Sequence, residues 1–441
     1  MKSARQVAFE ALLKIHKDGA FSNLAVDNAL KENPELDDRD KAFVTNIVYG
    51  TLERLMLIDY NLSLYLNQPL KKLKPELHTI LRMGAYQILF MDKVPAHAAV
   101  SESVALAKEN KSAFAASVVN AVLRRVADAG VKYPDMDEKS PEYLSVKYSC
   151  PQWIIELWAN AYGFDNAVAM AERALDTPPV TVRVNTLKTN ADDLIWKLAE
   201  EGVISEKSAD MEDTLVLSNT GSVDSLEAYK QGLFHAQDKA SQLCCAALAP
   251  VVGDTVFDMC ASPGGKTFTI AEIMGNTGTI KAFDIYQSRV DLIRNGAKTL
   301  GITNVISTLS DASVYNENFG TADRILCDVP CSGLGVIRRK PEIRYKTAAD
   351  IAGLPDIQFS IICNAARYLK PGGRLVYSTC TLNPAENDDV CDRFLSRFED
   401  FEAVDFLPDE PRIDPESKYL TLMPHVHGTD GFFIAVFEKK R

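Results

Sequence analysis

D-M-C-A-S-P-G-G-K-T, residues 258–267, is the stretch that decides the predicted fold. It follows a β-rich run at 255–260, and a helical pattern begins directly after it. Its two adjacent glycines let the backbone approach a ligand at the carboxyl end of a strand, where open α/β sheets bind ligands. A P-loop would require glycine at Cys260, and the glycine spacing of a dinucleotide fingerprint is missing. The predicted ligand therefore need not be bound through a phosphate.

Short β-rich runs alternate with helical segments from residue 255 onward. The runs are 255–260, 279–285, 304–309, 324–329 and 374–378. This alternation predicts an α/β fold of the Rossmann-like kind, with a mostly parallel, doubly wound sheet covered by helices. A last run, 431–437, follows a polar, proline-containing segment without an obvious crossover helix, so we expect an antiparallel edge strand there.

The region before this sheet divides into two further parts. Apolar residues recur at helical spacing from 4 to 129, which predicts an all-helical domain at 1–135. Expected helix caps, first-turn residues and stops are Asp37, Asp38, Pro75 and Gly130. After a polar linker, a helix with two tryptophans precedes alternating valines, which predicts a small α+β subdomain at 145–235. The catalytic domain would then occupy 236–441.

Composition is that of an ordinary globular protein, with 46% hydrophobic and 24% charged residues. The net charge of −12 argues mildly against a general nucleic-acid binder, although local basic clusters occur. These are Lys71, Lys72 and Lys74, then Arg124 and Arg125, and then Arg338, Arg339, Lys340 and Arg344. Taken alone, such a cluster is more often a solvated face.

Nine cysteines without a C-x-x-C pair indicate reduced thiols and no zinc site, so we assign Cys244 and Cys245 to helix packing. The sequence has neither the pattern of a secretory signal nor an apolar run long enough to span a membrane. We therefore expect a cytoplasmic protein that binds no metal and no membrane.

Acidic residues follow three successive predicted strands. Asp284 ends the second strand and could accept both hydroxyls of a ribose, while Asp311 follows the third and could accept the amino group of an adenine. Each aspartate alone could instead be a helix cap or turn residue. The set, without a phosphate fingerprint, favours S-adenosylmethionine over a dinucleotide. The expected cofactor residues are Cys260, Ala261, Ser262, Pro263, Gly264, Gly265, Lys266, Asp284, Asp311 and Asp328.

Two cysteines lie just beyond the carboxyl ends of the fourth and fifth strands. Cys331 is in D-V-P-C-S-G-L-G, 328–335, and Cys380 is in Y-S-T-C-T, 377–381. Neighbouring strand ends in a doubly wound sheet would bring both thiols to one substrate. The alternative is a pair of buried small hydrophobes. Loop positions after strands favour the functional interpretation.

These motifs resemble the RNA 5-methylcytosine methyltransferase family. The resemblance extends to Q-D-x-A-S-Q at 237–242, N-P-A-E-N at 383–387 and D-G-F-F at 430–433, and it departs from the family pattern at Ser262 and Val329. The helical part resembles the NusB antitermination-factor domain at 80–90 and 117–125. This pairing of domains is similar to bacterial enzymes that methylate a cytosine of small-subunit (16S) ribosomal RNA.

The resemblance implies catalytic roles for four residues. Cys380 would attack C6 of the cytosine, and Asp328 would hold the base edge so that N3 is protonated. Cys331 would assist release, directly or through water, and Lys266 together with the sulfonium would favour the thiolate. We expect a monomer acting on free or early-assembly 16S rRNA, recognised by the helical domain and the region 153–231.

Two other functions are compatible with parts of the sequence. An amino-group methyltransferase would need an Asp/Asn-Pro-Pro-aromatic loop where this chain has Asp328, Val329, Pro330 and Cys331. A ribosome-assembly or antitermination factor that binds RNA without catalysis would fit the helical domain. The intact glycine loop and both cysteines count against that second alternative.

Overall fold

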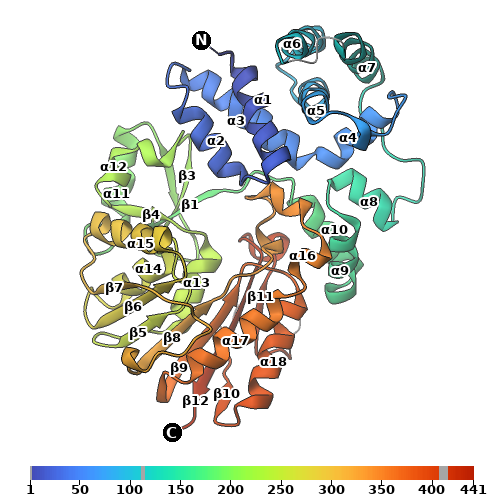
Figure 1. The fold of residues 1–441 in the computed structure, drawn as a ribbon. Coiled ribbons are helices and arrows are strands. Elements are labelled where there is room, and N and C mark those ends of the chain that lie inside the picture. The colour runs from blue at the N-terminus through green and yellow to red at the C-terminus, as the bar shows by residue number, and fades with distance from the viewer. Residues whose placement is uncertain (1, 111–114, 407–415) are drawn as a thin grey trace. The chain divides into compact units, whose positions relative to one another are not determined.

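The computed structural model describes residues 2–110, 115–406 and 416–441, and the chain forms two compact units (Figure 1). Unit 1 consists of Met1–Thr177 and Ile337–Lys346, and unit 2 of Pro178–Val336 and Thr347–Arg441. Among the helices of these described ranges, none is long and apolar enough to cross a membrane.

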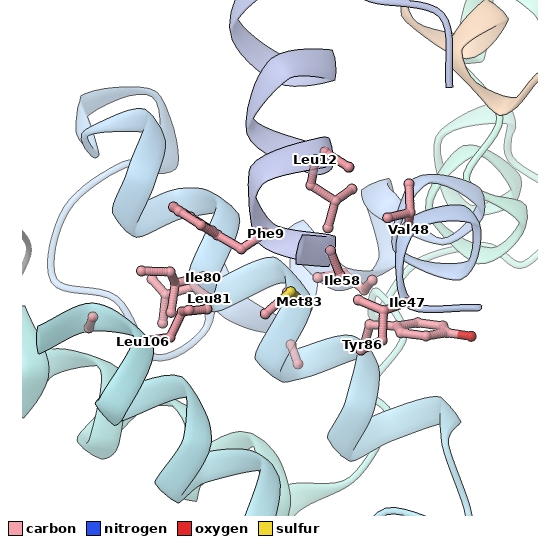
Figure 2. Close-up of a cluster of buried hydrophobic side chains, with 14 of the residues drawn as sticks. Phe9, Leu12, Ile47, Val48, Ile58, Ile80, Leu81, Met83, Tyr86 and Leu106 are labelled. Atoms are coloured by element: carbon pink, nitrogen blue, oxygen red, sulfur yellow. The ribbon is translucent and has the colours of Figure 1, made fainter. Parts of the chain in front are cut away.

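Unit 1 is helical throughout its described residues, as predicted. Its elements are α1 (Ala4–Asp18), α2 (Ser22–Lys31), α3 (Asp38–Glu53), α4 (Leu55–Ser63), η1 (Leu70–Lys72), α5 (Pro75–Phe90), α6 (Ala96–Glu109), α7 (Ala116–Ala129), α8 (Pro141–Tyr148), α9 (Gln152–Tyr162), α10 (Phe164–Arg173) and η6 (Pro341–Tyr345). Helices α1, α3, α4, α5 and α6 contribute to one buried apolar cluster (Figure 2). Burial of each large apolar side chain in this cluster stabilises the fold by about 1.5–3 kcal/mol.

The predicted helix boundaries of unit 1 are confirmed with one correction. Asp37 is the N-cap of α3, where its carboxylate accepts the amide of Asp40 at 2.7 Å. Asp38 is the first helical residue rather than a cap. Pro75 begins α5, and Gly130 ends α7 with a φ of 66°, a conformation that favours glycine.

Unit 2 begins with a small antiparallel sheet in the order β2-β3-β1-β4. Its elements are β1 (Val180–Val184), α11 (Ala191–Glu200), β2 (Ile204–Lys207), β3 (Thr214–Ser218), η3 (Val223–Ser225), α12 (Glu227–Lys230) and β4 (Phe234–Ala236). Val182 and Val184 are fully buried, as the alternating pattern predicts. The α+β prediction for this part is confirmed.

The larger sheet of unit 2 has the strand order β10-β12-β9-β8-β5-β6-β7, with β11 paired to β12. Its strands are β5 (Thr255–Asp258), β6 (Thr279–Asp284), β7 (Val305–Leu309), β8 (Ala322–Asp328), β9 (Leu369–Thr379), β10 (Phe401–Ala403), β11 (Leu420–Leu422) and β12 (Phe432–Lys439). Its helices are α13 (Lys239–Leu248), α14 (Gly265–Ile273), α15 (Gln287–Leu300), η4 (Glu317–Phe319), η5 (Leu334–Val336), α16 (Ala348–Ile351), α17 (Leu354–Ala366), η7 (Pro384–Glu386), α18 (Asp388–Arg397) and α19 (Pro424–His427).

The five strands from β5 to β9 are parallel, which confirms the doubly wound prediction. Helices α13, α14 and α15 cover one face of the sheet, and α17 and α18 cover the other (Figure 1). The chain runs outward in both directions from β5, so the topological switch lies between β5 and β8. Ligands bind outside the carboxyl ends of strands at such a point.

Two smaller predictions for unit 2 have different outcomes. Strand β12 is antiparallel to β9 as expected, but it is not an edge strand, because β10 and β11 pair with its outer side. Strands β10 and β11 were not predicted from the sequence, because each is only three residues long. Cys244 and Cys245 are fully buried in α13, which confirms their packing role.

The segment Ile337–Lys346 belongs to unit 1 although it lies between elements of unit 2 in the sequence. Arg344, only 4% exposed, fastens it there. Its guanidinium donates to the carbonyl oxygen of Glu53 and, at 2.6 Å, to that of Ala174. These carbonyls end α3 and α10, where helices leave acceptors unpaired and favour a cation.

We expect Arg344→Lys to lower the free energy of unfolding of unit 1 by about 1–3 kcal/mol, because an ammonium cannot reproduce the planar fork that reaches both carbonyls. Urea unfolding would measure the loss, and hydrogen–deuterium exchange should place it at the ends of α3 and α10. Arg39→Lys, on an exposed position of α3, is the matched control. Equal unfolding midpoints for the two variants would contradict the prediction.

Candidate active site

The two predicted catalytic cysteines meet at the carboxyl ends of neighbouring strands. Cys331 lies three residues beyond β8, and Cys380 directly follows β9. Strands β8 and β9 are paired in parallel with Asp328 opposite Ser378, and the two sulfur atoms lie 3.3 Å apart. Both side chains are partly exposed. The predicted convergence of the thiols is therefore present in the structure.

The Cys331 thiol has an unusual electrostatic environment. Its pKa is raised well above the usual value, first by the hydrogen bond with Cys380, then by burial, and further by the negative charges near it. These charges come from Cys380, Glu386 and Asp328. A thiol in this environment holds its proton firmly and is a strong base once deprotonated.

Lys266 and Asp328 form a close ion pair beside the thiols. The Lys266 ammonium donates to Asp328 Oδ2 at 2.7 Å, and the Ser378 hydroxyl donates to Oδ1 at 2.9 Å. Burial alone would lower the pKa of Lys266, but the adjacent Asp328 carboxylate outweighs it and the pKa is raised. Lys266 is therefore a cation, and its charge acts first on Asp328.

The glycine loop connects β5 to α14 and carries Cys260, Ala261, Ser262 and Pro263 as predicted. Gly264 has a φ of 114°, and a Cβ there would lie 2.3 Å from the ring of Phe268. At Gly265, where α14 begins, a Cβ would meet only Gln237 Nε2, at 3.9 Å. The loop thus demands glycine at one position and leaves open space at the next, which suits close approach by a ligand.

Asp284 and Asp311 stand at the ends of neighbouring strands, as predicted, but each also makes a local turn contact. One oxygen of Asp284 accepts the amide of Tyr286 at 3.0 Å. Asp311 Oδ1 accepts both the amide and the hydroxyl of Ser313. A cavity of about 530 Å³ is lined by Asp311 and residues 314–318, and Asp311 is the only predicted cofactor residue in its lining.

A buried carboxylate that the sequence did not single out connects the two cysteine loops. Glu386, in η7, is fully buried, and its oxygens accept bonds from four donors. The donors are the amide and hydroxyl of Ser332, the side-chain amide of Gln358 and that of Asn383. The sequence feature that could have pointed to Glu386 is its place in the N-P-A-E-N motif, shortly after β9 and Cys380.

Asp258, the last residue of β5, is a second buried carboxylate beside the site. Burial raises its pKa to about 7, although the hydroxyl of Thr267 donates to it at 2.6 Å. The signal for this residue was its place at the strand end within the glycine-loop stretch. As for metals, the described residues contain no group of three or more His, Cys, Asp or Glu side chains that could hold an ion.

Three family models match the chain. One described as 16S rRNA methyltransferase RsmB/F covers residues 245–438, one of the NusB family covers 2–128, and one of an RsmF/B-like, ferredoxin-like domain covers 150–224. The predicted NusB-like domain is thereby confirmed, and the α+β subdomain is identified as ferredoxin-like.

Known proteins resemble the chain over its whole length. The probable ribosomal RNA small subunit methyltransferase B of Bacillus subtilis (strain 168) is 39% identical, covering 99% of each chain. A crystal structure of PH0851 has a TM-score of 0.86 at 28% identity, covering 100% of this chain and 99% of that one. A structure of NSun6 from Pyrococcus horikoshii with SFG has a TM-score of 0.60 at 25% identity, covering 66% of this chain and 98% of that one.

The fold, the domain order and the full-length similarity agree. The chain therefore belongs to the 16S rRNA methyltransferase RsmB/F family of S-adenosylmethionine-dependent enzymes.

Proposed function

We propose that the protein methylates C5 of a cytosine in 16S rRNA, with Cys380 as the nucleophile and Cys331 as the group that assists release. The observation that carries this proposal is the 3.3 Å separation of the two sulfur atoms at the ends of β8 and β9. One base placed above these strand ends could contact both thiols. A factor that only binds RNA would have no use for such a pair.

Cytosine C5 is too weak a nucleophile to accept a methyl group unaided. In the proposed reaction the Cys380 thiolate adds to C6, a C6–S bond forms, and the displaced electron pair moves onto C5. Asp328 faces the base edge, where it, or water that it orients, gives N3 a proton as the adduct forms and takes that proton back on release. The Asp328 carboxylate is paired with the Lys266 ammonium, which places a cation beside it. In release, the C5 proton is lost to Cys331 in its thiolate form or to water that Cys331 orients, the C5–C6 double bond re-forms, and the C6–S bond breaks with Cys380 leaving as a thiolate.

The residues around the glycine loop fit S-adenosylmethionine, which supplies an electrophilic methyl group on its sulfonium. The open space at Gly265 would admit the ligand, with the loop 260–266 along one side. Asp284, at the end of β6, would bind the ribose, although its Oδ2 also lies 4.0 Å from the Arg289 guanidinium, and Asp311 would face the adenine. The related structure of NSun6, which was determined with SFG, supports a ligand site in this fold.

Recognition of rRNA is assigned to unit 1, including its NusB-like part, and to the ferredoxin-like subdomain. A base inside folded RNA must be turned out to reach a pocket, so contacts to the surrounding RNA are a separate task from chemistry. We expect a monomer that acts on free or early-assembly rRNA.

The two cysteines should give opposite mutant behaviour. Cys380→Ala should abolish methylation and form no covalent complex, because no thiol remains to add to C6. Cys331→Ala should still attack and transfer the methyl group, but should accumulate a protein–RNA adduct because release is impaired. Denaturing electrophoresis with labelled 16S rRNA measures the adduct. Trapping by Cys380→Ala alone would reverse the roles, and full activity of both variants would exclude the thiol mechanism.

Asp284→Ala should weaken binding of S-adenosylmethionine by about 1–3 kcal/mol, the usual loss when a charged acceptor is removed from its donors. Isothermal titration calorimetry measures the affinity. The matched control is Asp291→Ala, a surface carboxylate of α15 whose contacts are with Gln287 and Arg294. If both variants bind the ligand as the unaltered protein does, the ribose assignment is wrong.

A basic cluster of the helical domain provides a test of RNA recognition. Lys71 and Lys72 are exposed in η1, and replacing both with alanine should lower the salt dependence of rRNA binding by up to about 0.7–0.9 per lysine in the log–log slope. Affinity for S-adenosylmethionine should stay unchanged. Filter binding at several salt concentrations, with Lys108→Ala as control, gives the slope. An unchanged slope would identify the cluster as a solvated face.

A further inference from the structure

The Glu386 carboxylate joins the loops of both cysteines at one buried point. Oε2 accepts the Ser332 amide at 2.8 Å and the Gln358 side-chain amide at 2.9 Å. Oε1 accepts the Ser332 hydroxyl and, at 2.9 Å, the Asn383 side-chain amide. Ser332 directly follows Cys331, and Asn383 lies three residues after Cys380. One carboxylate therefore fixes residues next to each thiol.

Further bonds around this point close a network between the loops. The same Gln358 amide also donates to the Pro330 carbonyl at 3.0 Å, on the other side of Cys331 from Ser332. The hydroxyls of Ser332 and Thr381 are 2.6 Å apart, and Thr381 directly follows Cys380. Ser332, Gln358 and Thr381 are fully buried. Water therefore does not readily replace a lost hydrogen bond here. Loss of any one of these bonds would leave a buried polar group unpaired, which destabilises the structure.

We propose that Glu386 is a positioning residue for catalysis, which holds the Cys331 loop against the Cys380 loop so that Cys331 can assist the release step. This inference rests on the thiol mechanism proposed above and deepens it. Glu386 does not touch the reacting atoms. It acts through Ser332, and its negative charge lies on the Cys331 side of the site.

The charges around Cys331 support this role. The groups that act on its thiol are Cys380 after β9, Glu386 in η7 and Asp328 at the end of β8. Lys266 pairs with Asp328, whereas the four hydrogen-bond donors of Glu386 described above are neutral amides and a hydroxyl. A negative charge near a thiol raises its pKa and makes its thiolate a stronger base. Removing the charge should therefore lower the pKa of Cys331, which reports whether Glu386 acts on this thiol, whereas the effect on release follows from the lost anchor of the Cys331 loop.

Glu386→Gln tests the proposal with little change in volume, and Glu399→Gln, at an exposed position of the same unit, is the control. We expect Glu386→Gln to accumulate the covalent protein–RNA adduct, as Cys331→Ala does, while its affinity for S-adenosylmethionine stays within about twofold of the unaltered protein. Mass spectrometry of iodoacetamide labelling across a pH series gives a second readout. The labelling midpoint of Cys331 should move to lower pH, and each unit of movement raises the thiolate fraction about tenfold below the midpoint.

The labelling midpoint decides the inference independently of the reaction mechanism. A midpoint equal to that of Glu399→Gln would overturn the role of Glu386, even if activity fell. If Cys331→Ala forms no adduct, the release mechanism fails, whereas a shifted midpoint in Glu386→Gln would still support positioning. Should Glu386→Gln fail to fold, Ser332→Ala replaces it, since it removes the hydroxyl contacts with Glu386 and Thr381 but keeps the backbone amide bond to Glu386. Faster labelling of Cys331 at high pH in that variant supports the inference, and an unchanged rate overturns it.

Discussion

The contact between two sulfur atoms, 49 residues apart in the sequence, is the constraint on which the site depends. It requires the backbones behind both thiols to approach closely. The Gly335 amide donates to the Cys380 carbonyl, and its own carbonyl accepts the Gly431 amide. A Cβ at Gly335 would lie 2.0 Å from the Gly431 carbonyl oxygen, so only glycine fits. The final strand β12 begins directly after this contact, and it therefore helps to hold the cysteine loops as well as completing the sheet.

Charge is divided across the site. The ammonium of Lys266 is matched by Asp328 on the cofactor-loop side, and the Glu386 carboxylate is held by neutral donors on the Cys331 side. Two chemically identical thiols in contact thus have different surroundings. The two cysteines have the same side chain, so only the charged groups around each thiol can distinguish the role of one from that of the other. That Lys266 together with the sulfonium favours the thiolate stays a prediction.

Features with a regular local pattern could be predicted from the sequence. The helical spacing of apolar residues predicted the helices of unit 1. The alternation of β-rich and helical runs predicted the parallel sheet, and the sheet in turn predicted that Cys331 and Cys380 lie close together. Features that depend on contacts between distant segments could not be predicted. Glu386 receives its donors from three separate segments, and β10 and β11 are too short to show a period. The placement of Ile337–Lys346 in unit 1 likewise depends on tertiary contacts through Arg344.

That placement has a consequence for how the chain is made. Domains generally fold as units, amino-terminal first, while synthesis is still in progress. The helices of unit 1 leave the ribosome early, but the ends of α3 and α10 must wait for the Arg344 guanidinium, which is translated 170 residues after Ala174. Unit 1 therefore cannot reach its final form during translation until strands β5 to β8 of the larger sheet have also been synthesised. Completion of the helical unit is thus coupled in time to the arrival of the Cys331 loop, which immediately precedes the fastening segment.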